Sequence, residues 1–216
     1  MVPGNVEIEL YNTYLEPQKG SYGSAYWQRQ LEMETGITDR LDFSFYLTSN
    51  DTHTTDINSN NEVKARTRFK LTEQKNDFIF DPLIYLEYTF QENRQFPDLL
   101  EFRGVMAKDI GSLHGAVNLI AQEQVNAVDF VKYWDFGYTG GVSYPVISDN
   151  FRVGIESTGD FNNNKYSLGP AVSYRGRRIW GAAGAVFGLN NNSEYIKVQA
   201  IIGVIFDLTA MPELKN

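Results

Sequence analysis

Polar and apolar residues alternate along most of this chain, in segments of roughly ten residues. In 63–71 an extended chain would carry Lys64, Arg66, Arg68 and Lys70 on one face and mainly apolar residues on the other. A helix would scatter these charges around its axis. The pattern therefore predicts an all-β fold of antiparallel strands, each with one polar and one apolar face.

Segments of this kind follow one another along the whole chain, separated by turns rich in polar residues and glycine. They cover 6–11, 28–35, 41–47, 63–71, 82–90, 99–107, 116–124, 134–144, 151–157, 166–174, 179–188 and 195–206. These segments predict about twelve strands. An even number of antiparallel strands returns the chain to its starting side, so we expect both termini at one end of the barrel. No linker divides the sequence, and 1–216 is expected to form a single barrel domain with 209–216 as a short tail.

The connections alternate between short turns and longer polar loops. The short turns are 36–40, 74–77, 109–111, 147–150 and 175–178, and the longer loops include 17–25, 48–61, 92–98 and 162–164. Transmembrane β-barrels have short turns at one end and longer loops at the other. The two sets of lengths therefore favour an up-and-down barrel.

Composition and charge exclude several other classes of protein. The formal net charge is -8 and no basic stripe is present, so nucleic acid is not an expected partner. The chain has no cysteine, which removes disulfides, thiolate metal sites and cysteine nucleophiles. No apolar run approaches the roughly 18 residues of a membrane-spanning helix. The first residues lack a signal-peptide pattern, so an exported barrel would be present here as its mature chain.

Alternation alone also fits a soluble β-sandwich or lipocalin, because both bury one face of each strand. Aromatic residues at the strand ends favour the membrane barrel, since such residues form girdles at the two membrane interfaces. They are Tyr14, Tyr26, Trp27, Phe90, Trp134, Tyr144, Phe151, Tyr174 and Trp180. Pro170 argues against closure, because proline cannot donate a ladder hydrogen bond, and a closed barrel would need a β-bulge there.

The run 35–47, Thr-Gly-Ile-Thr-Asp-Arg-Leu-Asp-Phe-Ser-Phe-Tyr-Leu, resembles the strand–turn–strand hairpin of Gram-negative outer-membrane barrels. The last predicted strand ends at Phe206 and is similar to the aromatic-ended final strand of such barrels, although this chain continues to Asn216. The resemblance implies an up-and-down transmembrane barrel in the cell outer membrane, with both termini periplasmic. It also implies contact with outer-membrane lipid and lipopolysaccharide, and with the barrel-assembly machinery during biogenesis.

If the apolar faces contact lipid, the polar faces line the lumen, where an acidic ladder from the first three strands meets a basic ladder from the fourth. The candidate pore-lining residues are Glu7, Glu9, Glu32, Glu34, Asp42, Lys64, Arg66, Arg68, Lys70, Glu87, Glu101, Arg103, Arg152 and Lys197. These charges either pair and fill a small lumen or form the walls of a water-filled pore. About twelve strands lie between the filled eight-stranded barrels and the open porins.

The sequence predicts a porin-like channel for ions or small polar solutes, with a plugged structural barrel as one alternative. A second alternative is a barrel enzyme acting on lipids, which would need a histidine at its lipid-facing rim. The chain offers His53, in a loop with Asp51 and Asp56, and His114, which follows a short turn. A third, a transporter of hydrophobic molecules, conflicts with the charged polar faces. We expect no catalytic residue, metal or cofactor, and the oligomeric state stays open.

Overall fold

The computed structural model describes residues 2–18, 24–52, 60–72, 79–126 and 133–208. Within these ranges the chain folds into twelve β-strands and no helix. The strands are β1 (Asn5–Glu16), β2 (Tyr26–Gly36), β3 (Leu41–Thr52), β4 (Asn60–Lys70), β5 (Asp81–Gln91), β6 (Asp98–Ile110), β7 (Leu113–Val125), β8 (Trp134–Ser148), β9 (Phe151–Asp160), β10 (Lys165–Arg175), β11 (Ile179–Gly188) and β12 (Ile196–Asp207). In this part of the chain, no helix has the length and apolar character needed to span a membrane.

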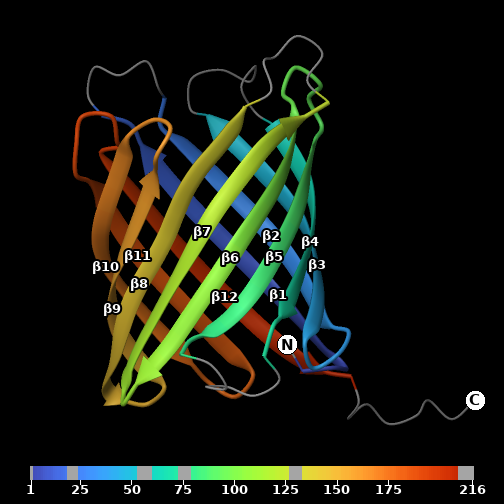
Figure 1. Ribbon diagram of the computed structural model, residues 1–216, viewed down its shortest axis with the longest axis vertical. Helices are drawn as coiled ribbons and strands as arrows, with labels where there is room; N and C mark the ends of the chain where they lie inside the picture. The colour runs from blue at the N-terminus through green and yellow to red at the C-terminus, as the bar shows by residue number, and fades with distance from the viewer. Residues whose placement is uncertain (1, 19–23, 53–59, 73–78, 127–132, 209–216) are drawn as a thin grey trace, which may run out of the picture.

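The strands form one closed antiparallel barrel in simple chain order (Figure 1). Each strand pairs with the next, and β12 pairs with β1 in unbroken register from Asn5 opposite Asp207 to Glu16 opposite Ile196. Because the sheet closes on itself, every strand has hydrogen-bonding neighbours on both sides. The predicted all-β, twelve-stranded, up-and-down barrel is confirmed.

The barrel is inverted relative to a soluble β-protein, with its charges inside and its apolar residues outside. On β1 the side chain of Leu10 is 54% exposed, whereas its neighbour Glu9 is 6% exposed. The same contrast recurs around the ring, with Met33 and Leu119 among many exposed apolar residues. A soluble sandwich or lipocalin would bury these apolar side chains in its core. The outer surface is therefore suited to the hydrocarbon region of a membrane.

The two ends of the barrel differ in the length of their connections. Short turns join β2 to β3, β6 to β7, β8 to β9 and β10 to β11 at the end where both described termini lie (Figure 1). The fifth connection at this end is an exception, because β4 ends at Lys70 and β5 begins at Asp81. The prediction of a short connection there is wrong, and residues 74–77 themselves lie outside the described residues. Longer connections lie at the opposite end, among them 92–97 and 189–195. The predicted loop 48–61 is too long, because β3 continues to Thr52 and β4 begins at Asn60. The predicted tail 209–216 lies outside the described residues.

Pro170 fits into the closed barrel without a β-bulge, so the bulge predicted there is wrong. Its strand β10 pairs with β9 in continuous register through Pro170 opposite Ile155. Toward β11 the pairing stops after Leu168 and resumes at Ala171 in the same register. A Cβ on Gly169 would lie 1.8 Å from the carbonyl oxygen of Ala185, so glycine permits the close approach of the two strands there.

Most of the aromatic residues predicted to form girdles lie on the outer surface near the strand ends. Tyr14 packs against Trp27 with ring centroids 5.0 Å apart, and Trp134 packs against Phe136 at 6.3 Å. Tyr26 is one exception, because on β2 it has the same parity as the inward Glu32 and Glu34. Trp180 is another, because its indole Nε1 donates a hydrogen bond to Glu7 inside the lumen. The assignments of Tyr26 and Trp180 to a girdle are therefore wrong.

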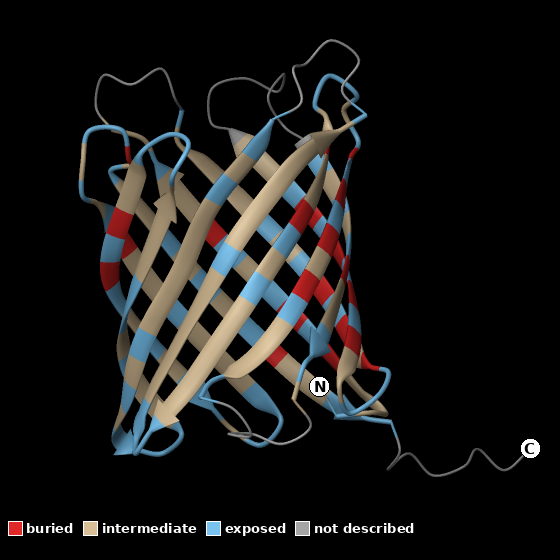
Figure 2. Cartoon of the chain, in the orientation of Figure 1, coloured by how far each residue is buried: buried red, intermediate tan, exposed pale blue. Residues whose placement is uncertain are grey.

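Buried polar residues are concentrated on one side of the ring, as the red positions of Figure 2 indicate. Apart from Ser167 and Ser193, every buried polar or charged residue among those described lies on β1–β6. We call β1–β6 the charged half and β7–β12 the open half. Figure 2 also shows exposed and less exposed positions alternating along the strands of both halves.

Candidate functional site: the barrel lumen

The candidate pore-lining residues face the lumen, where they contact one another or line its cavities. The charged half contributes Glu7, Glu9, Glu32, Glu34, Asp42, Lys64, Arg66, Arg68, Lys70, Glu87, Glu101 and Arg103. The open half contributes only Arg152 and Lys197 to this set. Strand alternation points all of them inward, but their partners differ greatly between the halves.

Arg66 is the centre of an acid–base network in the charged half, and its side chain is only 6% exposed. Its guanidinium donates hydrogen bonds to Glu34 and to the hydroxyl oxygens of Ser44 and Tyr46. Its Nη2 also lies 2.8 Å from Oε1 of Glu32, an ion-pair contact that lacks hydrogen-bond geometry. These partners come from β2 and β3, so the predicted acidic and basic ladders meet as ion pairs.

The neighbouring cations of β4 extend the network along the wall. The Nε atom of Arg68 donates to Oδ1 of Asp42 at 2.8 Å, and its Nη2 pairs with Glu34. Lys64 Nζ lies 3.7 Å from Oε1 of Glu87 on β5. Charges removed from bulk water need such partners, because an unpaired buried ion is strongly unfavourable.

Tyrosines complete the network, although none of them was among the predicted pore-lining residues. The single hydroxyl proton of Tyr11 serves two carboxylate oxygens, with Glu9 Oε2 at 2.5 Å and Glu32 Oε2 at 2.8 Å. The Arg66 guanidinium carbon lies 5.3 Å from the ring centroid of Tyr46 and 5.7 Å from that of Tyr85. Both ring faces therefore stabilise the cation.

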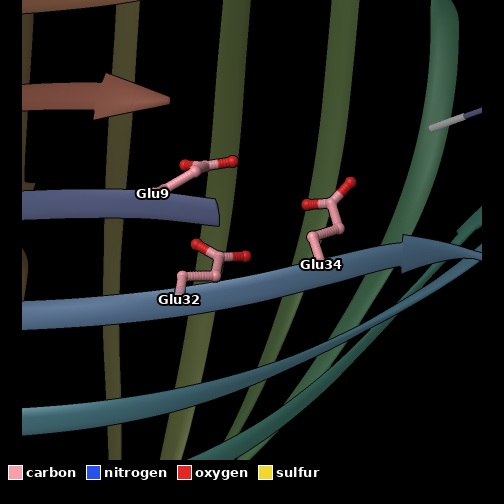
Figure 3. Close-up of side chains that lie close together, drawn as sticks. All are labelled: Glu9, Glu32 and Glu34. Atoms are coloured by element: carbon pink, nitrogen blue, oxygen red, sulfur yellow. The ribbon is translucent and has the colours of Figure 1, made fainter. Parts of the chain in front are cut away.

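Three carboxylates of β1 and β2 gather beside this network, as Figure 3 shows for Glu9, Glu32 and Glu34. One oxygen of each lies within 4.8 Å of the others, and carboxylate oxygens are suitable ligands for calcium or magnesium. Here Arg66 supplies positive charge to Glu32 and Glu34, and Tyr11 supplies a donor to Glu9. The cluster therefore carries its own cation, and we assign it a structural role in the wall.

The open half encloses a cavity of about 660 Å³, which we call the open-half cavity. It extends from His114, the second residue of β7 at the end with the short turns, to Lys197, the second residue of β12 at the opposite end. Its walls consist mainly of small residues, among them Ala116, Thr139, Gly141, Ser143, Gly154, Thr158, Ala171, Ser173, Ala182 and Gly184. Small side chains leave this volume empty along most of the barrel.

Two further cavities adjoin the open-half cavity. A middle cavity of about 430 Å³ shares Arg103, Asn118 and Gln199 with it. A third cavity of about 510 Å³, at the end where the termini lie, shares Tyr11, Arg66 and Arg68 with the middle cavity. The lumen therefore holds a series of adjoining spaces rather than a solid core of side chains.

The cavity walls carry more cations than carboxylates, in contrast to the chain's net charge of -8. The lining cations are Lys64, Arg66, Arg68, Lys70, Arg103, Arg152, Arg175 and Lys197, and the lining carboxylates are Glu7, Glu9, Glu34, Glu87 and Glu156. The carboxylates of Glu32 and Asp42, which are 0% and 4% exposed, line none of these three cavities. Long cationic side chains thus cover shorter acids.

The two histidines were candidates for a lipid-modifying site. His114 faces the lumen, and its Nδ1 lies 2.5 Å from Oδ1 of Asp109 on the neighbouring strand. This position places it inside the barrel, away from the lipid-facing rim that such chemistry requires. His53 and Asp56 lie outside the described residues, and Asp51 lies 3.9 Å from Arg29.

Comparison with known proteins identifies the fold. No protein-family model matches the chain, and no curated protein matches it significantly. Among solved structures it is similar to the KdgM porin in complex with disordered oligogalacturonate (TM-score 0.64, 9% identity, covering 93% of this chain and 98% of that one). It is also similar to an outer membrane channel from Pseudomonas putida F1 (0.63, 10% identity, 95% and 97%) and to the NanC porin (0.62, 14% identity, 92% and 98%). The chain therefore has the outer-membrane β-barrel fold.

Proposed function

We propose that this protein is a narrow channel of the bacterial outer membrane, through which ions or small polar solutes diffuse. The observation that carries the proposal is the open-half cavity, whose lining runs from one end of the barrel nearly to the other. Its polar and charged lining suits hydrated solutes better than hydrophobic ones. The likeness to outer-membrane porins and channels in fold supports the same interpretation.

The membrane location rests on the outer surface of the barrel. Exposed apolar side chains surround it, and an aromatic pair such as Tyr14 and Trp27 suits the interface between lipid and water. We propose that the end with the short turns and both termini faces the periplasm, as is usual for these barrels. Outer-membrane lipid and lipopolysaccharide would then contact the wall, and the barrel-assembly machinery would insert it.

Two alternatives fit the lumen less well. A plugged barrel would have side chains filling the lumen along its length, whereas three adjoining cavities lie inside this barrel. A lipid hydrolase would need its histidine beside the hydrocarbon, whereas the one histidine among the described residues, His114, faces the lumen. We therefore propose diffusion through the lumen in preference to lipid chemistry at the wall.

Planar-bilayer recording of the refolded protein tests the proposal. We expect stepwise currents of small and uniform size, because the charged half leaves only part of the barrel cross-section free. Detergent without protein and the heat-unfolded protein serve as controls. A correctly folded barrel that inserts into the bilayer and passes no current would contradict the channel.

A further inference from the structure

Lys197, on β12, has no close partner among the described residues, unlike the lumenal cations of β4 and β6. Among the described residues, its ammonium has no hydrogen bond and no ion pair within 4.0 Å, whereas Arg66, Arg68 and Arg103 all pair with carboxylates. The charges of Glu194, Arg103 and Glu156 act on it from farther away. The Lys197 charge is therefore directed to whatever occupies the open-half cavity.

Arg103 lines the same cavity from the other side of the barrel. Its strand β6 and the Lys197 strand β12 lie half a ring apart in the strand order. One edge of the guanidinium pairs with Glu101 and its face lies 4.5 Å from the ring centroid of Tyr85, yet the side chain stays 31% exposed. Two cations thus project into one space from opposite walls.

Polar amides lie beside these cations, at the junction of the open-half and middle cavities. Asn118 Nδ2 donates to the Thr139 hydroxyl at 2.7 Å, and Gln199 Nε2 donates to the Thr13 hydroxyl at 3.0 Å. Each amide nitrogen carries two protons, so each retains a donor for a solute. Donors thus surround the space between the two cations.

The carboxylates near this space offset the positive charge only in part, since Glu101 pairs with Arg103 whereas Lys197 and Arg152 have no carboxylate partner within 4.0 Å among the described residues. Glu156 is the one carboxylate that lines the open-half cavity among the described residues. Glu87 lines the middle cavity, but it receives a hydrogen bond from Tyr85 and lies 3.7 Å from Lys64. With Arg152 also lining the open-half cavity, positive charge predominates along the path.

We propose that Arg103 and Lys197, with Asn118 and Gln199 beside them, form a binding site for small anionic solutes that carry carboxylate or phosphate groups. The site rests on the proposed channel function, and it makes the channel selective for anions although the chain as a whole is acidic. Arginine presents a planar fork of donors to a carboxylate or phosphate, and lysine adds a point charge. A solute held between the two cations is retained briefly and can leave toward either end, as conduction requires.

The test combines reversal potentials in a potassium chloride gradient with block of the current by citrate. We expect the wild-type channel to prefer chloride and to be blocked by citrate. Lys197→Gln should weaken citrate block by about fivefold, the effect of removing one unit charge close to the ligand in water. Glu156→Gln should shift the reversal potential further toward the equilibrium potential of chloride. Lys108→Gln, the same charge change beside the apolar groove of the outer wall, serves as the control and should leave both readouts unchanged.

Each outcome separates the site from the channel. A wild-type current that prefers potassium, or citrate block that is equal in Lys197→Gln and wild type, would overturn the anion site and leave the channel intact. If Lys197→Gln does not fold, Glu156→Gln still decides, because an unchanged reversal potential in that variant contradicts the site. If the wild type passes no current, calorimetric titration of the folded protein with citrate decides, and absence of binding overturns the site.

Discussion

The two halves of this barrel share one backbone architecture but differ in the size and charge of their inward side chains. In the charged half, long acidic and basic side chains such as Glu34 and Arg66 bury and neutralise one another, and two smaller cavities remain beside them. In the open half, small residues such as Gly141 and Ala182 leave a continuous space. The difference teaches that strand number alone does not decide whether a barrel is open, because the length and pairing of inward side chains decide it as well.

The largest expected effect is on stability, from the loss of the central cation of the charged half. Arg66→Met leaves Glu32 and Glu34 without their shared guanidinium, which should cost about 3–5 kcal/mol of unfolding free energy. Lys197→Met removes a cation of the open half that has no close partner, and should change stability by less than about 1 kcal/mol. Urea unfolding of both variants in lipid vesicles, followed by tryptophan fluorescence, measures the contrast. Equal losses would show that the two halves do not differ in this way.

A smaller effect should follow the loss of one hydroxyl from the network. Tyr11→Phe removes the donor shared by Glu9 and Glu32, and should cost about 1–3 kcal/mol because a buried acceptor is left unsatisfied. The comparison variant is Tyr138→Phe on the outer face of β8, whose hydroxyl lies 2.9 Å from the uncharged Ser157 hydroxyl. That change should cost less than about 1 kcal/mol. The same unfolding measurement compares the two, and a reversed order would argue against a stabilising role for the network.

The smallest expected effect is on conductance, and it follows from narrowing the open-half cavity. Ala182→Phe places a ring in the open-half cavity and should roughly halve the single-channel conductance, because current in a narrow pore follows the free cross-section. The adjacent Ala183 is exposed on the outer surface, so Ala183→Phe is a control on the same strand. Bilayer recording should give wild-type conductance for Ala183→Phe. Unchanged conductance in both variants would place the permeation path elsewhere in the lumen.

The sequence predicted the strands and the charged ladders because alternation is a local property of an extended chain. Arg66 and Glu34 could be placed on inward faces from parity alone, and Tyr11 and Tyr46 lie on the same polar faces, which was the available signal for their role. Trp180 could not be placed, because the segment 179–188 is apolar or glycine on both faces and gives no parity. The prediction of a bulge at Pro170 was wrong, because two residues of β10 are left unpaired toward β11 and the register stays unchanged.

The cavities could not be predicted, because the sequence gives the face of a side chain and not its path across the lumen. Lys64 and Lys197 are both inward lysines, yet one lies 3.7 Å from Glu87 and the other has no close partner among the described residues. That distinction depends on which strands the closed ring places nearby. Because Arg66 is paired and Lys197 has no close partner among the described residues, a substitution of Arg66 tests stability, whereas a substitution of Lys197 is the better test of ion selectivity.

The network around Arg66 also has a consequence for the order of folding. Its members come from consecutive strands, since Tyr11 lies on β1, Glu32 on β2, Tyr46 on β3 and Arg66 on β4. Its contacts therefore join segments that are close along the chain. Such contacts carry a small loop-closure cost and can form before β12 meets β1. Arg103 and Lys197 come to face one cavity only when the ring closes. The charged half can therefore satisfy its ions early in assembly, whereas the anion site comes into existence with the last pairing of strands.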